Sequence, residues 1–124
     1  MILIVDADAV SGPSLARLLR YNGHPAEVVG SPMEALALLP TRKPVAIILD
    51  LDLPHLSGVR LIKAIRLDRT YDDVPIIVYT GDFSQAMGRE AMEAGAADVI
   101  IKGTVGTQSL LARIEKFLKN GGAE

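Results

Sequence analysis

The sequence contains no cysteine. This absence excludes disulfides, thiolate metal sites and cysteine nucleophiles, and it fits a reducing compartment. An excess of basic charge is also missing, because 13 Lys and Arg residues stand against 15 Asp and Glu residues, for a formal net charge of −2. A chain balanced in this way is a poor candidate for binding nucleic acid through bulk charge.

Long apolar runs are absent as well. The first run begins at Met1 and meets Asp6 too early to be a signal peptide or a membrane span. The chain is nevertheless 49% apolar and 23% charged, which is typical of a globular domain that buries its own core. We therefore expect one soluble, cytoplasmic domain over residues 1–120, followed by a flexible C-terminal tail, residues 121–124.

Five short apolar runs predict β-strands. Three of them are continuous and rich in Ile and Val, which is typical of strands that are covered on both faces, as in a parallel sheet. The runs are Ile2–Val5, Ala26–Val29, Val45–Leu49, Ile76–Tyr79 and Val99–Ile101.

Segments with helical spacing separate and follow these runs. Residues 31–34 form a capping box with proline at the first helical position, and we expect Pro40 to end that helix. Residues 84–94 predict a helix that Gly95 stops, and residues 121–122 are glycines that we expect to end the last helix. Five repeats of strand and helix predict an α/β fold with a doubly wound parallel sheet.

Polar groups follow four of the five predicted strands. They are Asp6, Asp8, Asp50, Asp52, Thr80 and Lys102. Ligands of open α/β sheets bind at the carboxyl ends of the strands, so we expect these groups to converge. Several carboxylates in one cleft repel each other unless a cation lies among them, and oxygen ligands suit Mg²⁺. A metal, a hydroxyl and an ammonium group together suit a phosphoryl group.

A simpler interpretation stays open for some of these residues. A single Asp at a strand end is usually a turn former or a helix N-cap, and this applies to Asp8 and to the side chain of Asp52. His24 and His55 lie in loops without metal-ligand spacing, and we expect both at the surface. The glycines form no GxGxxG or P-loop pattern.

In this order, the residues resemble the receiver domain of two-component response regulators. The resemblance covers essentially the whole chain. Its motifs are ILIVD at 2–6, IILDLDLP at 47–54 with Gly58 further on, PIIVYTG at 75–81, AGAAD at 94–98, and Lys102. The resemblance implies a flavodoxin-like (βα)5 fold with the strand order 2-1-3-4-5.

The same resemblance assigns chemistry to single residues. It implies that Asp50 is the phosphoacceptor, that Thr80 bonds the phosphoryl group, and that Lys102 pairs with the acyl phosphate. It also implies a Mg²⁺ cofactor, held by Asp6, by Asp50 and by the backbone carbonyl of Asp52.

The resemblance implies partners as well. The phosphoryl donor would be a sensor histidine kinase or a histidine phosphotransfer protein, and the signal would pass to a downstream protein partner or an output domain. In this family the fourth helix, fifth strand and fifth helix often carry the signal, and they correspond to residues 84–118. We expect no direct contact with nucleic acid or membrane, and a monomer or weak dimer.

Three positions depart from the family pattern. Ala7 stands where the family has a second acid, and Asp8 is the candidate substitute because residues two apart in an extended chain point to the same side. Val99 stands where the family often has Tyr or Phe, and Gly103 where it has proline.

Two alternatives stay open, and the three departures motivate the first of them. The first is a degenerate receiver that binds a partner without phosphorylation. The second is an enzyme, because residues 49–53 also resemble the first motif of haloacid-dehalogenase-type phosphatases. In such an enzyme Asp52 would be the general acid.

Overall fold

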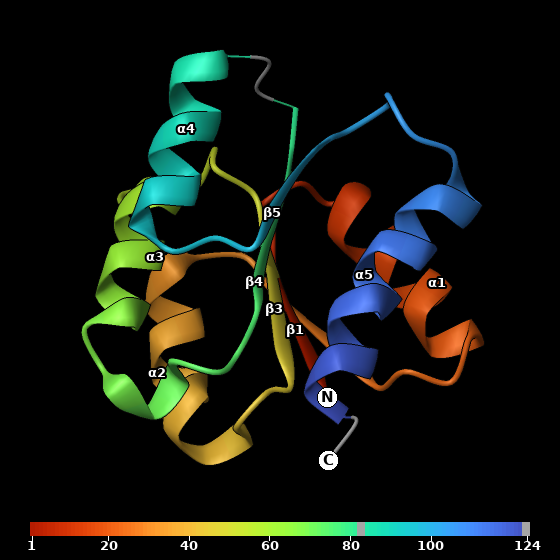
Figure 1. Ribbon diagram of the computed structural model, residues 1–124, viewed down its shortest axis with the longest axis horizontal. Coiled ribbons are helices and arrows are strands. Elements are labelled where there is room, and N and C mark those ends of the chain that lie inside the picture. The colour runs from red at the N-terminus through yellow and green to blue at the C-terminus, as the bar shows by residue number, and fades with distance from the viewer. Residues whose placement is uncertain (82–83, 123–124) are drawn as a thin grey trace.

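The computed structural model describes residues 1–81 and 84–122. Strands and helices alternate along the chain, as the sequence predicts (Figure 1). The strands are β1 (Ile2–Val5), β2 (Ala26–Val29), β3 (Ala46–Leu49), β4 (Ile76–Thr80) and β5 (Asp98–Ile101). The helices are α1 (Ser11–Tyr21), α2 (Pro32–Arg42), α3 (Gly58–Arg66), α4 (Gln85–Ala94) and α5 (Thr107–Gly122), with a 3-10 turn, η1 (Arg69–Tyr71), before β4.

The five strands form one parallel sheet with the order β2-β1-β3-β4-β5. Helices α2, α3 and α4 cover one face, and α1 and α5 cover the other (Figure 1). Neighbouring residues of a strand point to opposite faces, so Leu3 belongs to the core beneath α2 and α3, whereas Ile4 belongs to the core beneath α1 and α5. The predicted flavodoxin-like fold is confirmed.

The central strands explain the continuous apolar runs of the sequence. Every residue of β1 and of β3 is buried, because both faces of these strands are covered by helices. The two edge strands, β2 and β5, contain half-buried positions instead. The two fully buried strands, β1 and β3, are neighbours in the sheet, so their carboxyl ends lie side by side.

The prediction that Pro40 ends its helix is wrong. Helix α2 continues to Arg42, and the N–H of Lys43 donates to the carbonyl of Leu39 at 3.2 Å. Proline lacks only its own N–H, so in the last turn it removes a single backbone hydrogen bond and the helix tolerates it. Lys43, with φ 46°, closes the helix in the left-handed conformation.

The sequence predicts both ends of α4 correctly, but it does not predict where α5 ends. Ser84 caps α4 by accepting from the N–H of Met87 at 3.3 Å, and Gly95 closes it at φ 124°, as expected. Helix α5 includes both glycines that we expected to end it. Residues 123 and 124 lie outside the described part, and the flexible tail stays a prediction. Within residues 1–81 and 84–122, no helix is long and apolar enough to cross a membrane.

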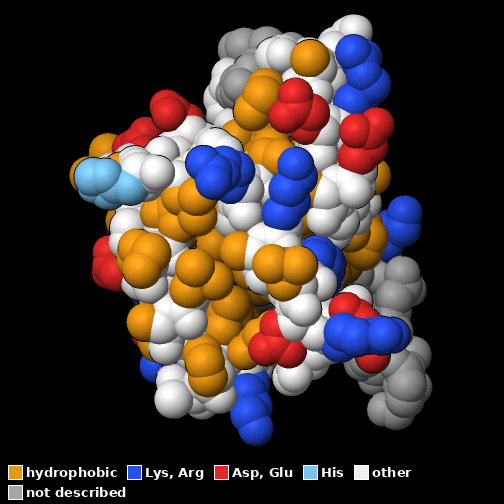
Figure 2. Space-filling model, turned by 90° about the vertical axis from the view of Figure 1, so that its left-hand side faces the viewer, with side chains coloured by type: hydrophobic (Ala, Val, Ile, Leu, Met, Phe, Trp, Pro, Cys, Tyr) orange, Lys and Arg blue, Asp and Glu red, His pale blue; other side chains and the backbone are white. Residues whose placement is uncertain are grey.

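The side of the molecule that α2, α3 and α4 form carries apolar side chains at its surface (Figure 2). Met33 on α2 is 68% exposed, and Leu67, directly after α3, is 85% exposed. Single apolar side chains at a surface are common in monomeric proteins, so this face does not by itself indicate a binding site.

Candidate functional site

Four of the predicted residues meet at the carboxyl end of the sheet. Asp6 and Asp50 directly follow β1 and β3, which pair in register up to Val5 and Leu49, so the two carboxylates are neighbours. Thr80 ends β4, and Lys102 directly follows β5. Figure 1 shows these strand ends at one edge of the molecule. The four residues that meet there are Asp6, Asp50, Thr80 and Lys102.

Asp50 lies at the centre of the hydrogen bonds. Its Oδ1 accepts from the hydroxyl of Thr80 at 2.7 Å and from the N–H of Asp52 at 3.1 Å. Its Oδ2 accepts from Nζ of Lys102 at 2.8 Å. Asp50 is only 8% exposed and Thr80 is fully buried, so these bonds are made largely away from water. Burying a carboxylate is costly unless hydrogen bonds and an opposite charge replace the water that it loses.

Lys102 bridges the two carboxylates. Its ammonium lies 2.8 Å from Asp50 Oδ2 and 2.9 Å from Asp6 Oδ2. Burial alone would lower the pKa of Lys102, but the hydrogen bonds to Asp50 and Asp6 and the negative charges of these two carboxylates together raise that pKa above its ordinary value. The group therefore carries a fixed positive charge.

Asp8 lies at the edge of this cluster. Strand β1 ends at Val5, so the extended chain that would point Asp6 and Asp8 to the same side does not continue to Asp8. Oδ1 of Asp8 instead accepts from the backbone N–H groups of Val10 at 2.8 Å and of Ser11 at 3.3 Å, next to the start of α1. These bonds lower the pKa of Asp8 below its usual value. Asp8 still borders the same pocket as Asp50 and Lys102.

The side chain of Asp52 is exposed, and its backbone N–H is the part that bonds to Asp50. This placement differs from that of Asp50, whose carboxylate is buried. The two acids of the motif therefore lie in different surroundings although only one residue separates them.

An open pocket of about 620 Å³ lies over Asp50. Its lining residues are Asp8, Asp50, Leu51, Asp52, Gly81, Met87 and Lys102. Gly81 leaves this side open, because a Cβ there would have nothing within 4 Å. Met87 is not predicted from the sequence, since its place over the site depends on how α4 packs. The one sequence signal for Met87 is its position in the first turn of a helix that starts four residues after Gly81.

The donor set fits Mg²⁺. Asp6 and Asp50 share a single ammonium group, so negative charge remains in excess beside a polar pocket. Among the described residues, no group of three or more His, Cys, Asp or Glu side chains is arranged to hold a metal ion. Mg²⁺ commonly binds through one or two carboxylates and keeps several waters, so a pair of carboxylates and one carbonyl is sufficient.

Neither histidine belongs to this cluster. Nε2 of His24 lies 2.7 Å from Oε2 of Glu115 on α5, where both side chains are only partly exposed. The expected surface position of His24 is therefore only partly correct, because it contacts α5. His55 is exposed, as expected.

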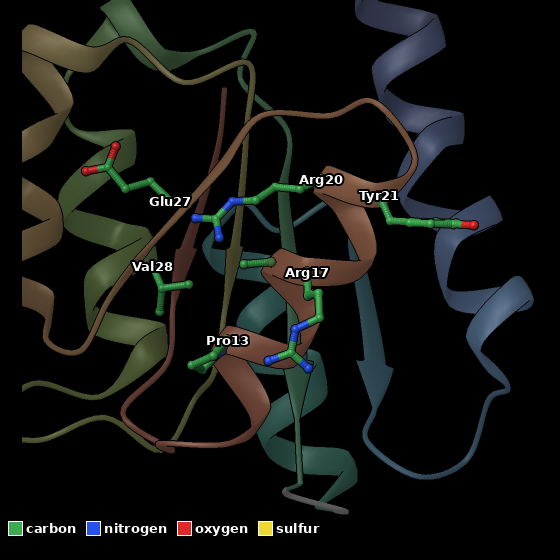
Figure 3. A pocket seen from close by; sticks show the side chains of 7 residues that line it. Pro13, Arg17, Arg20, Tyr21, Glu27 and Val28 are labelled. Carbon is green, nitrogen blue, oxygen red and sulfur yellow. The ribbon is translucent and has the colours of Figure 1, made fainter.

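A second pocket, of about 630 Å³, lies between α1 and β2 (Figure 3). The residues that line it include Arg17, Arg20 and Tyr21 of α1, and Glu27 and Val28 of β2. The guanidinium of Arg20 donates to the carbonyl of Ala26 at 2.7 and 3.0 Å and so ties the helix to the strand. None of the predicted site residues lines this pocket, although it is as large as the pocket over Asp50.

A parallel sheet with this strand order and an Asp–Thr–Lys cluster at its carboxyl edge is typical of a phosphoacceptor signalling domain. The family model for the response regulator receiver domain matches residues 2–115. The chain belongs to this family. It is thus a receiver domain of two-component signal transduction, a signalling family and not a family of conventional enzymes.

Individual relatives agree with this assignment. The response regulator MprA of Mycobacterium sp. (strain KMS) is 36% identical over 118 residues, which are 95% of this chain and 50% of the relative. The chain therefore spans about half the length of the curated relatives it matches.

Solved structures match over nearly the whole chain. A CheY-like response regulator receiver domain protein from Methanospirillum hungatei has a TM-score of 0.87 at 27% identity, covering 97% of this chain and 94% of that one. The chemotaxis response regulator CheY4 of Vibrio cholerae has a TM-score of 0.85 at 25% identity, covering 94% and 96%.

Proposed function

We propose that the chain takes a phosphoryl group from a phosphohistidine onto the carboxylate of Asp50. The observation that carries this proposal is the geometry of Asp50: a buried carboxylate, open to one pocket, with a hydroxyl and an ammonium group each within 2.8 Å of its oxygens. A phosphoryl group transferred to Asp50 would meet the charge and the donor that stabilise it already in place.

The transfer is a displacement at phosphorus. A bond forms between an Asp50 carboxylate oxygen and phosphorus, while the bond between phosphorus and the donor's imidazole nitrogen breaks and leaves its electron pair on that nitrogen. Lys102 offsets the charge on the transferred oxygens, and the hydroxyl of Thr80 donates to one of them. The donor's nitrogen then takes a proton from water.

Mg²⁺ would be held by Asp6, Asp50 and the backbone carbonyl of Asp52, and when bound it neutralises charge on the phosphoryl oxygens. Asp8 is the candidate for a further ligand, acting through water or directly, in place of the acid that is missing at Ala7. Oδ2 of Asp8 would be the ligand atom, because Oδ1 already accepts from the backbone N–H groups of Val10 and Ser11.

Intact-mass analysis tests the phosphoacceptor. We expect wild type incubated with acetyl phosphate and Mg²⁺ to gain the mass of one phosphoryl group, and chelation of Mg²⁺ to prevent it. Asp50→Asn should gain nothing. Asp52→Asn is the matched control, because it removes an exposed carboxylate two residues away and should still be modified. Equal modification of wild type and Asp50→Asn would refute the assignment.

The partners follow from this chemistry. The donor would be a sensor histidine kinase or a histidine phosphotransfer protein, in the cytoplasm. Residues 84–118 would present the signal to a downstream protein or an output domain, and the chain would act as a monomer or weak dimer.

A second candidate is a receiver that binds a partner without phosphorylation. The observation that favours it is the bridge from Lys102 to both carboxylates, since the cluster is partly neutralised without a metal, together with Ala7 in the place of an acid. In that case Asp50→Asn would bind the partner as tightly as wild type does, and acetyl phosphate would leave the mass of wild type unchanged.

A further inference from the structure

Lys102 is held from two sides. On one side its ammonium donates to Asp50 and Asp6. On the other side it lies over the ring of Tyr79, with Nζ 5.6 Å from the ring centroid. An ammonium at this distance is attracted by the negative face of an aromatic ring, and the attraction grows as water is excluded. The side chain of Lys102 is only 20% exposed, so water screens this contact poorly.

The sheet explains why Tyr79 is the residue in this position. Tyr79 on β4 pairs with Ile100 on β5, and paired residues point to the same face. Lys102 lies two residues beyond Ile100, so its side chain starts from that same face. The backbone N–H of Lys102 also donates to the carbonyl of Thr80 at 2.7 Å, which fixes the end of β5 beside β4.

Tyr79 also contacts the other half of the molecule. It packs against the core beneath α1 and α5, which includes Leu110 and Ile114 of α5. Val99, the residue before Ile100, packs against the opposite core, beneath α2, α3 and α4. The described aromatic ring next to Lys102 is thus on the face of α5.

We propose that Tyr79 is a positioning residue for Lys102 in phosphoryl transfer to Asp50, an inference that rests on the proposed function. A lysine has a long flexible stem, and a ring on one side restricts the ammonium to the side of the two carboxylates. A phosphoryl group on Asp50 would attract the ammonium of Lys102. The distance between this ammonium and the ring of Tyr79 would then change. Gly103, which follows Lys102, has φ 83°, in the left-handed region that favours glycine.

NMR of the unphosphorylated protein tests the contact itself. We expect the ε-methylene protons of Lys102 to be shifted upfield by the ring current of Tyr79 in wild type and in Tyr79→Phe, and to return to the ordinary lysine position in Tyr79→Leu. Beryllofluoride with Mg²⁺, a stable mimic of the acyl phosphate, should reduce the shift in wild type. An ordinary lysine position in wild type would refute the contact whether or not any variant folds.

The rate of phosphorylation by acetyl phosphate tests the positioning. Tyr79→Leu should lower the maximal rate about three- to tenfold without a comparable change in the half-saturating donor concentration, because one cation–π contact is lost. Tyr79→Phe, which keeps the ring, should stay within about twofold of wild type. Tyr21→Leu, at an exposed position on α1, is the matched control.

Two outcomes would overturn the proposal: a Tyr79→Leu rate equal to that of wild type, or a Tyr79→Phe rate as low as that of Tyr79→Leu. If wild type takes no phosphoryl group, the proposed function fails and the positioning of Lys102 for transfer fails with it. The ring-current shift would still show separately whether Tyr79 and Lys102 are in contact.

Discussion

At the scale of single residues, the site depends on how closely the backbone after Asp50 packs against α3. A Cβ built on Gly58 would lie 2.6 Å from the carbonyl oxygen of Asp50 and 2.6 Å from Cα of Leu51. Both contacts are with backbone, which cannot rotate away. The glycine that the sequence motif carries therefore lets α3 begin directly against the backbone of Asp50 and Leu51.

We expect Gly58→Ala to lower the free energy of unfolding by about 1–3 kcal/mol, because the added methyl group forces this backbone apart. Phosphorylation of Asp50 should slow as well, since the loop carries the carboxylate. Gly88→Ala is the matched control: a Cβ there meets nothing within 4 Å, and alanine in a helix interior should add up to about 1 kcal/mol. Urea unfolding measures both, and equal effects at the two glycines would contradict the packing argument.

The ion pairs of Lys102 predict how stability depends on pH. Its pKa in the folded protein lies above the ordinary value of 10.5, so its stabilising effect is complete below that pH and is lost as the pH rises through the folded-state pKa. We expect Lys102→Met to be less stable than wild type by about 1–3 kcal/mol at neutral pH, with the partial exposure of the lysine reducing the full cost of two unpaired carboxylates.

The difference between wild type and Lys102→Met should stay constant below the ordinary lysine pKa of 10.5 and shrink only as the pH rises through the higher folded-state pKa, because wild type loses the same charge there. Urea unfolding at a series of pH values checks this. A difference that stays constant with pH would show that Lys102 stabilises the fold by packing and not by charge.

At the scale of elements, α3 is tied to its neighbours by one side chain. The guanidinium of Arg66 donates to the carbonyls of Tyr71 at 2.6 Å, Val74 at 2.9 Å and Gly95 at 3.1 and 3.2 Å. These carbonyls belong to η1, to the segment before β4 and to the turn after α4. Arg66 therefore joins the end of α3 to both connections that lead into β4 and β5.

We expect Arg66→Lys to lower the free energy of unfolding by about 1–3 kcal/mol, because a lysine cannot reach three carbonyls with one ammonium group. Arg60→Lys is the matched control on the same helix: Arg60 is exposed, and its exchange should change stability by less than about 0.5 kcal/mol. Hydrogen exchange of the turn after α4 should rise in Arg66→Lys alone. An unchanged exchange rate there would mean that the guanidinium does not fix this turn.

The elements also show where prediction from sequence succeeds. The apolar runs predict every strand to within one residue, because burial on both faces leaves a continuous pattern. The extra residue at the end of β4, Thr80, is a polar group that the pattern of apolar residues cannot include. Pro40 shows the opposite case, since the rule that proline ends a helix does not apply to the last turn.

At the scale of the whole molecule, the parallel order of the strands is what brings Asp6, Asp50, Thr80 and Lys102 together from positions spread over nearly the whole chain. The sequence predicts these four because each follows or ends a strand. It does not predict Met87 over the pocket or Tyr79 beside Lys102, because these contacts depend on helix packing and on the sheet register. Asp8 depends on where β1 ends, which a run of apolar residues does not determine to the residue.

A crystal structure of the protein with beryllofluoride and Mg²⁺ would test most directly whether Asp50 takes the phosphoryl group. We expect beryllium bonded to an Asp50 carboxylate oxygen, with the Thr80 hydroxyl and the Lys102 ammonium donating to its fluorines and the metal next to Asp6. Beryllofluoride on another carboxylate, or an Asp50 that binds none while Lys102 stays bridged between Asp6 and Asp50, would contradict it.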